Sequence, residues 1–272
     1  AGYVPRVLMG YRHLDGDGFA LGLVLETSPA IADTLGHVQT AIPQLPRDGA
    51  PLFELAAGVD VDALVDAVRA GVHELRNQPF HCDAFAAAAD GLDRLARALD
   101  NPLPAAVHGF RGFDFVVDDY VADPLTAKGA VVVLGAPAHA MLAGMLAKIA
   151  MPQVPDDGSP VELPIGTTLA QLGFGSLAAY AAARPDAAAL AVGDAAHGDS
   201  VKDRVVKALA AAPDPHGPLA SLTWDLARTI AIAPAAFAEN SQAAVMRSMK
   251  RMDVSVELKG HAIDLEFDAG WP

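Results

Sequence analysis

The sequence predicts an α+β fold in which a largely antiparallel sheet carries helices packed on one face. Three observations lead to this prediction. Alternating strand patterns joined by glycine turns stand at both ends of the chain, helical periodicity dominates several segments between them, and a run of β-branched residues marks a buried strand near the middle. Strands joined by hairpins pair antiparallel, which favours a sheet with its helices on one side.

The first two strands are predicted over 6–13 and 19–26, around the turn sequence DGDG. The aspartates invite comparison with a calcium loop, but the third ligand position falls on Phe19 and the closing position on Glu26, inside the return strand. The glycine spacing also misses the dinucleotide-binding pattern, and a strand follows where a phosphate loop needs a helix. Since Asp-Gly between apolar strands is a strong hairpin signal, the segment is predicted to be a turn.

Three amphipathic helices are predicted next. Ser28 is placed as the N-cap of the first, with a proline at its first helical position, and its apolar stripe ends at Pro43. A short strand at 51–58 separates it from a second helix that begins near Asp60, and a third helix is predicted within 81–102. Each has apolar residues at helical spacing on one face.

The rest of the chain returns to strands. The long apolar run at 130–151 has a length that suits a membrane span, but Gly135 and Pro137 interrupt it, so a buried strand turning into a helix is predicted instead. The remaining elements are strands at 110–120, 161–166 and 186–195, a helix at 200–211, an element of unassigned type at 218–232 and a closing hairpin at 252–271.

The two ends of the chain share the same pattern of two alternating strands about a glycine turn. This similarity predicts two α+β halves, which can be related: an N-terminal half over 1–105 and a C-terminal half over 106–272.

Composition excludes several classes of function. Hydrophobic residues make up 52% of the chain, the mean hydropathy is +0.28, and the formal net charge is -14. Such a surface repels nucleic acid and anionic lipid headgroups, so neither partner is predicted. Cys82 is the only cysteine, which excludes an intrachain disulfide and a cysteine metal cluster. Because the chain begins at Ala1, we expect a processed or truncated product.

The segment QPFHCDAF at 78–85 and the strand-like FRGFDFVVDDY at 110–120 resemble a pattern in a family of uncharacterised bacterial proteins exported beyond the inner membrane. Later segments, among them KGAVVVLGAPAHAMLAGML, PVELP and MKRMDVSVELKGHAIDLEF, extend the resemblance to about residue 267. The resemblance implies an extracytoplasmic (periplasmic or lipoprotein-like) location, an N-terminally longer parent chain that could be lipid-anchored, and no assigned activity. It carries over no functional residues.

No metal or cofactor is predicted. The acidic residues Asp114, Asp118, Asp119 and Asp123 gather near one strand, but the first two would lie about 13 Å apart on the same face, too far to share an ion. They are predicted to be a solvated strand edge. The nine histidines include no pair at zinc-binding spacing.

An acyl-transfer site is an alternative. Ser176 stands among glycines in GFGSL, and Asp194 and His216 follow in the chain order of α/β-hydrolases. The glycine spacing departs from the nucleophile elbow, so a turn is the preferred interpretation.

Two groups of methionines form the sharpest candidate for a binding surface. Met141 and Met145 share a helix face, whereas Met246 and Met249 alternate with the basic residues Arg247 and Lys250. Methionine adapts to varied apolar ligands, although it also fills ordinary cores. The leading hypothesis is a noncatalytic extracytoplasmic protein that binds a hydrophobic or amphiphilic ligand or an envelope partner. The alternatives are the serine hydrolase and a structural or protein-interaction domain.

Overall fold

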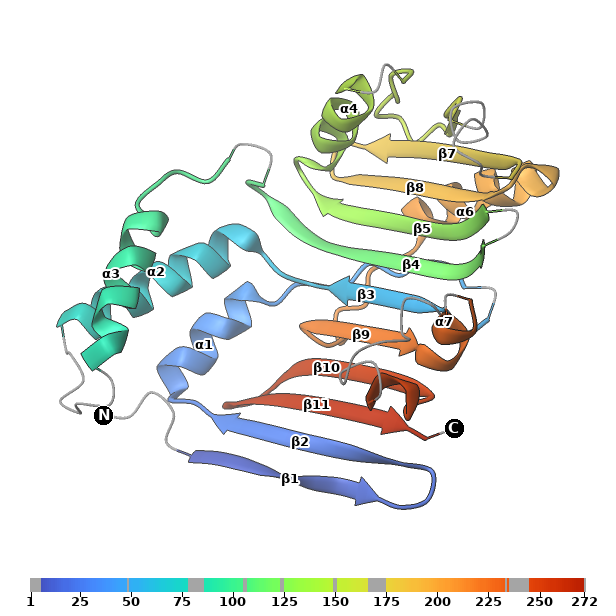
Figure 1. Cartoon of the computed structure of the whole chain (residues 1–272). Coiled ribbons are helices and arrows are strands. Elements are labelled where there is room, and N and C mark those ends of the chain that lie inside the picture. The colour runs from blue at the N-terminus through green and yellow to red at the C-terminus, as the bar shows by residue number, and fades with distance from the viewer. Residues whose placement is uncertain are drawn as a thin grey trace.

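The computed structural model describes residues 6–47, 49–77, 86–104, 107–122, 125–148, 151–165, 175–232, 234 and 245–271. Its strands form one antiparallel sheet of 11 strands in the order β1-β2-β11-β10-β9-β3-β4-β5-β8-β7-β6 (Figure 1). The strands are β1 (Arg6–Leu14), β2 (Gly18–Glu26), β3 (Phe53–Ala57), β4 (Phe110–Ala122), β5 (Leu125–Gly135), β6 (Val161–Glu162), β7 (Leu177–Arg184), β8 (Ala187–Asp194), β9 (Ala220–Asp225), β10 (Arg251–Lys259) and β11 (Ala262–Gly270). The predicted α+β class with a largely antiparallel sheet is confirmed.

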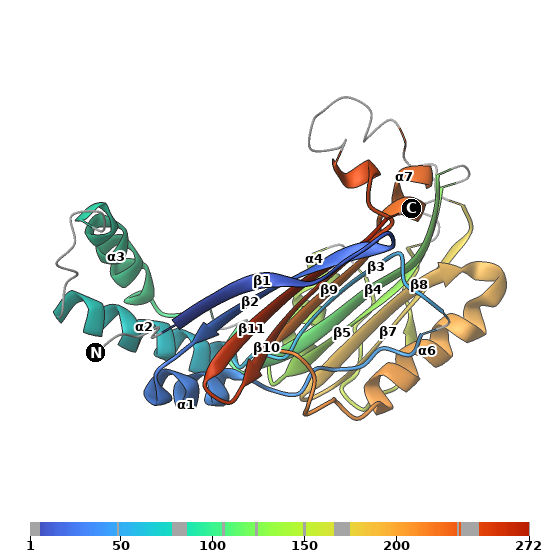
Figure 2. The same cartoon turned by 90° about the horizontal axis from the view of Figure 1, so that it is seen from below.

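Helices lie on both faces of this sheet, which corrects the expectation of a single helical face. The described helices are α1 (Pro29–Val38), α2 (Val61–Asn77), α3 (Ala86–Leu99), α4 (Ala138–Lys148), α6 (Gly198–Ala210) with the preceding 3-10 turn η2 (Ala195–His197), and α7 (Leu226–Ile232). Figure 2 shows α1 and α6 on one side of the sheet and α7 on the other. Helices α4 and α6 belong to separate core clusters on opposite sides of β7 and β8. These strands are apolar on both faces, so each face needs a cover.

Strands from both predicted halves interleave in the sheet. Strand β2 pairs with β11, and β3 lies between β9 and β4. The predicted division into 1–105 and 106–272 falls at residues outside the described ranges, and the relatedness of the two segments stays a prediction.

Local signals explain most elements. The Asp15 carboxylate accepts the backbone N–H groups of Asp17 (2.9 Å) and Gly18 (3.2 Å), which makes the DGDG segment the predicted turn. In the second hairpin the turn glycine has φ 61°, a conformation that favours glycine. The Ser28 hydroxyl caps α1, but the helix ends at Val38 rather than at the predicted proline. It ends early because the next residues pair with other segments instead.

Strand β7 is missing from the sequence prediction. Its sequence, LAAYAAAR, is rich in alanine, which is a poor strand former, and six of its eight residues are buried. Burial on both faces removes the alternation that marks a half-exposed strand.

Within the described ranges, no helix combines the length and apolar character needed to cross a membrane.

Candidate functional site

One face of the sheet is apolar across nine consecutive strands, from β8 to β1. Directly opposed residues in an antiparallel sheet point to the same face, so the strand register defines rows of side chains across it. Three neighbouring rows contain only apolar residues or glycine: Leu190, Val131, Phe115, Leu55, Leu222, Val254, Phe267, Leu21 and Tyr11; Ala188, Val133, Phe113, Ala57, Ala220, Val256, Leu265, Leu23 and Met9; and Val192, Gly129, Val117, Phe53, Trp224, Met252, Ala269, Phe19 and Leu14. We call these rows the apolar face.

The opposite face changes character along the sheet. Its row next to α6 contains Ala191, Ala130 and Val116, and the same row continues into Glu54, Thr223, Asp253 and Asp268. Strands β9, β10 and β11 are therefore amphipathic, with a polar side on this face and an apolar side on the other. A strand with one apolar side normally buries that side against another layer.

The apolar face is covered at one end only. Beneath α4, residues Ala179, Ala181 and Ala183 are 0% exposed. Beyond α4, Phe115 is 38% exposed, and the three rows on β9, β10, β11 and β2 are only partly buried apart from Ala269. Among the described helices, only α7 lies against this part of the face, near one end of the strands (Figure 2). The described structure therefore leaves an extended apolar surface with incomplete cover.

A first apolar cavity of about 260 Å³ lies between α4 and strands β5 and β8. Met141 and Met145 line it from the helix, opposite Val131, Val133 and Leu190 of the sheet. The structure thus brings the first pair of predicted ligand-binding methionines together on the apolar face. Met145 is 49% exposed, so it forms the open side of the cavity rather than core.

A second apolar cavity of about 310 Å³ lies where α7 crosses the same face. Its wall includes Phe53 and Trp224 of the sheet and Ile232 of α7. The Trp224 indole N–H donates to the Thr229 hydroxyl at 2.8 Å, which holds the ring against the helix. None of these residues was a sequence candidate, although alternation in the segment SLTWD is a signal for a half-buried strand.

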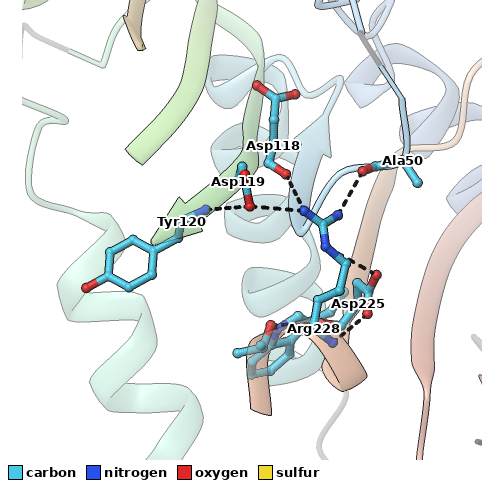
Figure 3. Close-up of polar contacts among 8 residues, drawn as sticks. Ala50, Asp118, Asp119, Tyr120, Asp225 and Arg228 are labelled. Atoms are coloured by element: carbon cyan, nitrogen blue, oxygen red, sulfur yellow. Dashed lines mark hydrogen bonds and ion pairs between the residues drawn. The ribbon is translucent and has the colours of Figure 1, made fainter. Parts of the chain in front are cut away.

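Arg228 fixes α7 in this position (Figure 3). Its guanidinium donates to the carbonyl oxygens of Ala50 (3.2 Å) and Asp118 (3.0 Å) and to the Asp119 carboxylate (3.2 Å). At the start of the helix, the Asp225 carboxylate accepts the Arg228 backbone N–H at 2.9 Å. These contacts tie α7 to the end of β4 and to the loop before β3, so the cavity wall is held by main-chain contacts.

The second predicted methionine group lies beside α7. Met246 and Met249 are half-buried, whereas Arg247 and Lys250 are exposed. The Lys250 backbone N–H donates to the carbonyl oxygen of Gly270 (2.6 Å), and its carbonyl oxygen accepts from the N–H of Ala227 in α7 (3.0 Å). This basic segment therefore stands at the α7 end of the apolar face, and the structure places it away from the α4 cavity of Met141 and Met145.

The acidic group on β4 differs from the predicted solvated edge. Asp114 is 1% exposed on the polar face, and its carboxylate accepts the backbone N–H of Leu45 at 2.9 Å. Burial raises the pKa of Asp114 to about 6, and the nearby carboxylate of Glu54 raises it further. Asp118 forms an ion pair with Arg204 of α6, and Asp119 contacts Arg228. These charges are structural because the core needs partners for them; Asp123 lies outside the described residues.

The hydrolase candidates do not converge. Ser176 is exposed just before β7, next to Asp194, because its neighbour Leu177 pairs with that residue. The Asp194 carboxylate accepts the Ala196 N–H instead of orienting a base toward the serine. His216 lines a separate polar cavity of about 600 Å³ with Lys259 of β10, and five strands lie between β10 and β7. At about 4.8 Å per strand, this separation keeps His216 out of reach of Ser176.

Among the described residues, no group of three or more His, Cys, Asp or Glu side chains is placed to hold a metal ion. Cys82 and His81 lie outside those residues.

Comparisons with known proteins found no match: no family model, no curated protein and no solved structure is similar to this chain.

Proposed function

We propose that this chain is a noncatalytic, extracytoplasmic protein that binds a hydrophobic or amphiphilic ligand of lipid size on the apolar face. The observation that carries the proposal is the set of three apolar rows, which run across nine strands and are only partly covered beyond α4. An exposed apolar patch of this extent marks an interaction site in a soluble domain. The extracytoplasmic location rests on the sequence resemblance alone.

The dimensions of the apolar face suit acyl chains. Nine strands span roughly 38 Å at about 4.8 Å per strand, and the three rows extend roughly 14 Å along them. The chains of one lipid leaflet are about 15 Å long, half of a hydrocarbon core of about 30 Å. The face therefore has room for more than one chain. Its two cavities are concave, which favours flexible chains over a flat envelope protein as the occupant.

The basic segment supplies a place for a polar head. Arg247 and Lys250 are exposed beside α7, whose far side closes the second cavity, and Met246 and Met249 lie next to them. An anionic headgroup near the two cations would leave its chains free to follow the apolar rows. The overall charge of -14 would repel such a head elsewhere on the surface.

Two measurements test the proposal. Mass spectrometry of an organic extract of the purified protein should find a co-purified lipid. In parallel, the chain has two tryptophans, so Trp271→Phe leaves Trp224 as the sole emitter. Because Trp224 lines a cavity on the apolar face, a fatty acid or phospholipid brominated on its chain should quench its fluorescence. Absence of both a co-purified lipid and quenching would reject lipid binding.

A matched pair of variants on β10 identifies the face. Val254 belongs to the apolar face, and its neighbour Ser255 points to the polar face. Val254→Gln should weaken binding of the brominated lipid about tenfold, since it places an amide against the chain, whereas Ser255→Gln should change it less than about twofold. Equal effects of the two substitutions would assign the ligand to another surface.

A further inference from the structure

The two edges of the sheet are protected differently. Edge strand β6 has only two residues, with Pro160 and Pro164 on either side and the charged Glu162 within it. Short edge strands, charges and prolines are the devices that prevent a sheet from pairing with another chain. Edge strand β1 has nine residues, contains no proline, and is exposed along its whole length. It therefore offers an open row of backbone donors and acceptors.

The side chains of β1 add to this exposure. On the apolar face, Val7 is 57%, Met9 81% and Tyr11 66% exposed. The two arginines of the strand already have partners, Arg6 with Glu26 and Arg12 with Asp264. The edge is thus apolar with its charges neutralised, and within the described part of the chain no element covers it.

We propose that β1 pairs antiparallel with β1 of a second copy of this chain, about a two-fold axis at Met9. This register places Met9 opposite Met9 of the second copy, Val7 opposite Tyr11 of the second copy, and Leu8 opposite Gly10 of the second copy. Each exposed apolar residue then meets an apolar residue on the same face, which is the arrangement that stabilises a strand pair. The inference does not depend on the proposed ligand.

Continuity of the apolar face supports a second copy as the occupant. A two-fold axis perpendicular to the sheet keeps the same face of both copies on the same side. The three apolar rows, which now end at Tyr11, Met9 and Leu14, would then continue into the second copy as one apolar surface. One strand pair buries less than a standard interface, so we expect a reversible dimer that forms at micromolar concentration.

Engineered disulfides test the register in the full chain with Cys82→Ser. Directly opposed residues have Cα atoms about 4.5–5.5 Å apart, within the range for a disulfide. Met9→Cys should therefore form a covalent dimer in high yield on mild oxidation. Val7→Cys alone should not, whereas a mixture of Val7→Cys with Tyr11→Cys should form the mixed dimer. Val206→Cys on α6, at a site that is 42% exposed, gives the yield from random collision.

Light scattering across a concentration series tests the association itself. The wild-type chain should pass from monomer to dimer, and Met9→Lys should weaken dimerisation at least about tenfold, because an edge lysine opposes pairing. Val206→Lys is the matched control and should leave the dimer unchanged. Circular dichroism checks that Met9→Lys is folded. A wild-type monomer at every concentration, or Met9→Cys crosslinking no better than Val206→Cys, would overturn the proposal.

Discussion

The buried carboxylate of Asp114 predicts a specific dependence of stability on pH. Its pKa rises from an ordinary value of 3.8 to about 6, mainly because burial disfavours the charged form. The native state therefore holds this proton over a pH range in which the unfolded chain releases it. Stability from the protonated group is fully present below pH 3.8 and is lost as pH rises to about 6. The difference corresponds to about 3 kcal/mol, at about 1.4 kcal/mol per pKa unit.

Asp114→Asn isolates this contribution, since the amide keeps the shape of the side chain and an oxygen for the Leu45 N–H. The variant cannot ionise, so its stability relative to the wild type should rise by about 3 kcal/mol between about pH 4 and about pH 7. Urea unfolding of both proteins at the two pH values measures this change. Asp156→Asn, at an exposed position, is the control and should show no such trend. The reasoning fails if the stability difference between Asp114→Asn and wild type is the same at both pH values.

Three further substitutions test the packing around the apolar face. Leu226→Ala removes a side chain that is 0% exposed at the start of α7 and should lower the free energy of unfolding by about 2–5 kcal/mol in urea unfolding; a loss below about 1 kcal/mol would show that the site is loosely packed. Gly135→Ala should destabilise by more than about 1 kcal/mol in the same assay, because φ is 127° and a Cβ would lie 2.2 Å from the carbonyl oxygen of Gly109, and an unchanged midpoint would contradict this backbone geometry. Arg228→Ala removes the contacts that hold α7, so hydrogen exchange of the α7 amides should accelerate while that of β7 stays unchanged; equal acceleration in both elements would mean that the arginine stabilises the whole fold instead.

Much of the secondary structure was predictable because its signals are local. The DGDG turn, the Ser28 cap and the glycine of the second hairpin each act within a few residues, and the structure confirms all three. Strand β7 was not predictable in this way, since alanines buried on both faces carry neither strand propensity nor alternation. The end of α1 also depended on distant partners, because Ile42 leaves the helical pattern to bridge with Asp214.

The candidate site was predictable only in part. The spacing of Met141 and Met145 on one helix face placed them together, and they do line a cavity. Their distance from the Met246 segment, and the role of Trp224 in a second cavity, required knowledge of which strands are neighbours. Likewise, the alternation of β4 gave Asp114 a face but not its environment. Its burial follows from Leu45, which is distant in sequence and lies against that face.

The sequence by itself determined where strands and helices form, that hairpins pair antiparallel, and which residues of each strand are apolar, since these depend on turn chemistry and side-chain period within short segments. Only the tertiary structure decided that β3 enters between β9 and β4 and that β2 joins β11. That strand order and register align separate apolar stripes into one face across nine strands. The physical reason is that a shift of one residue in any strand would turn its apolar side chains to the other face, and the register is set by contacts between segments far apart in the chain.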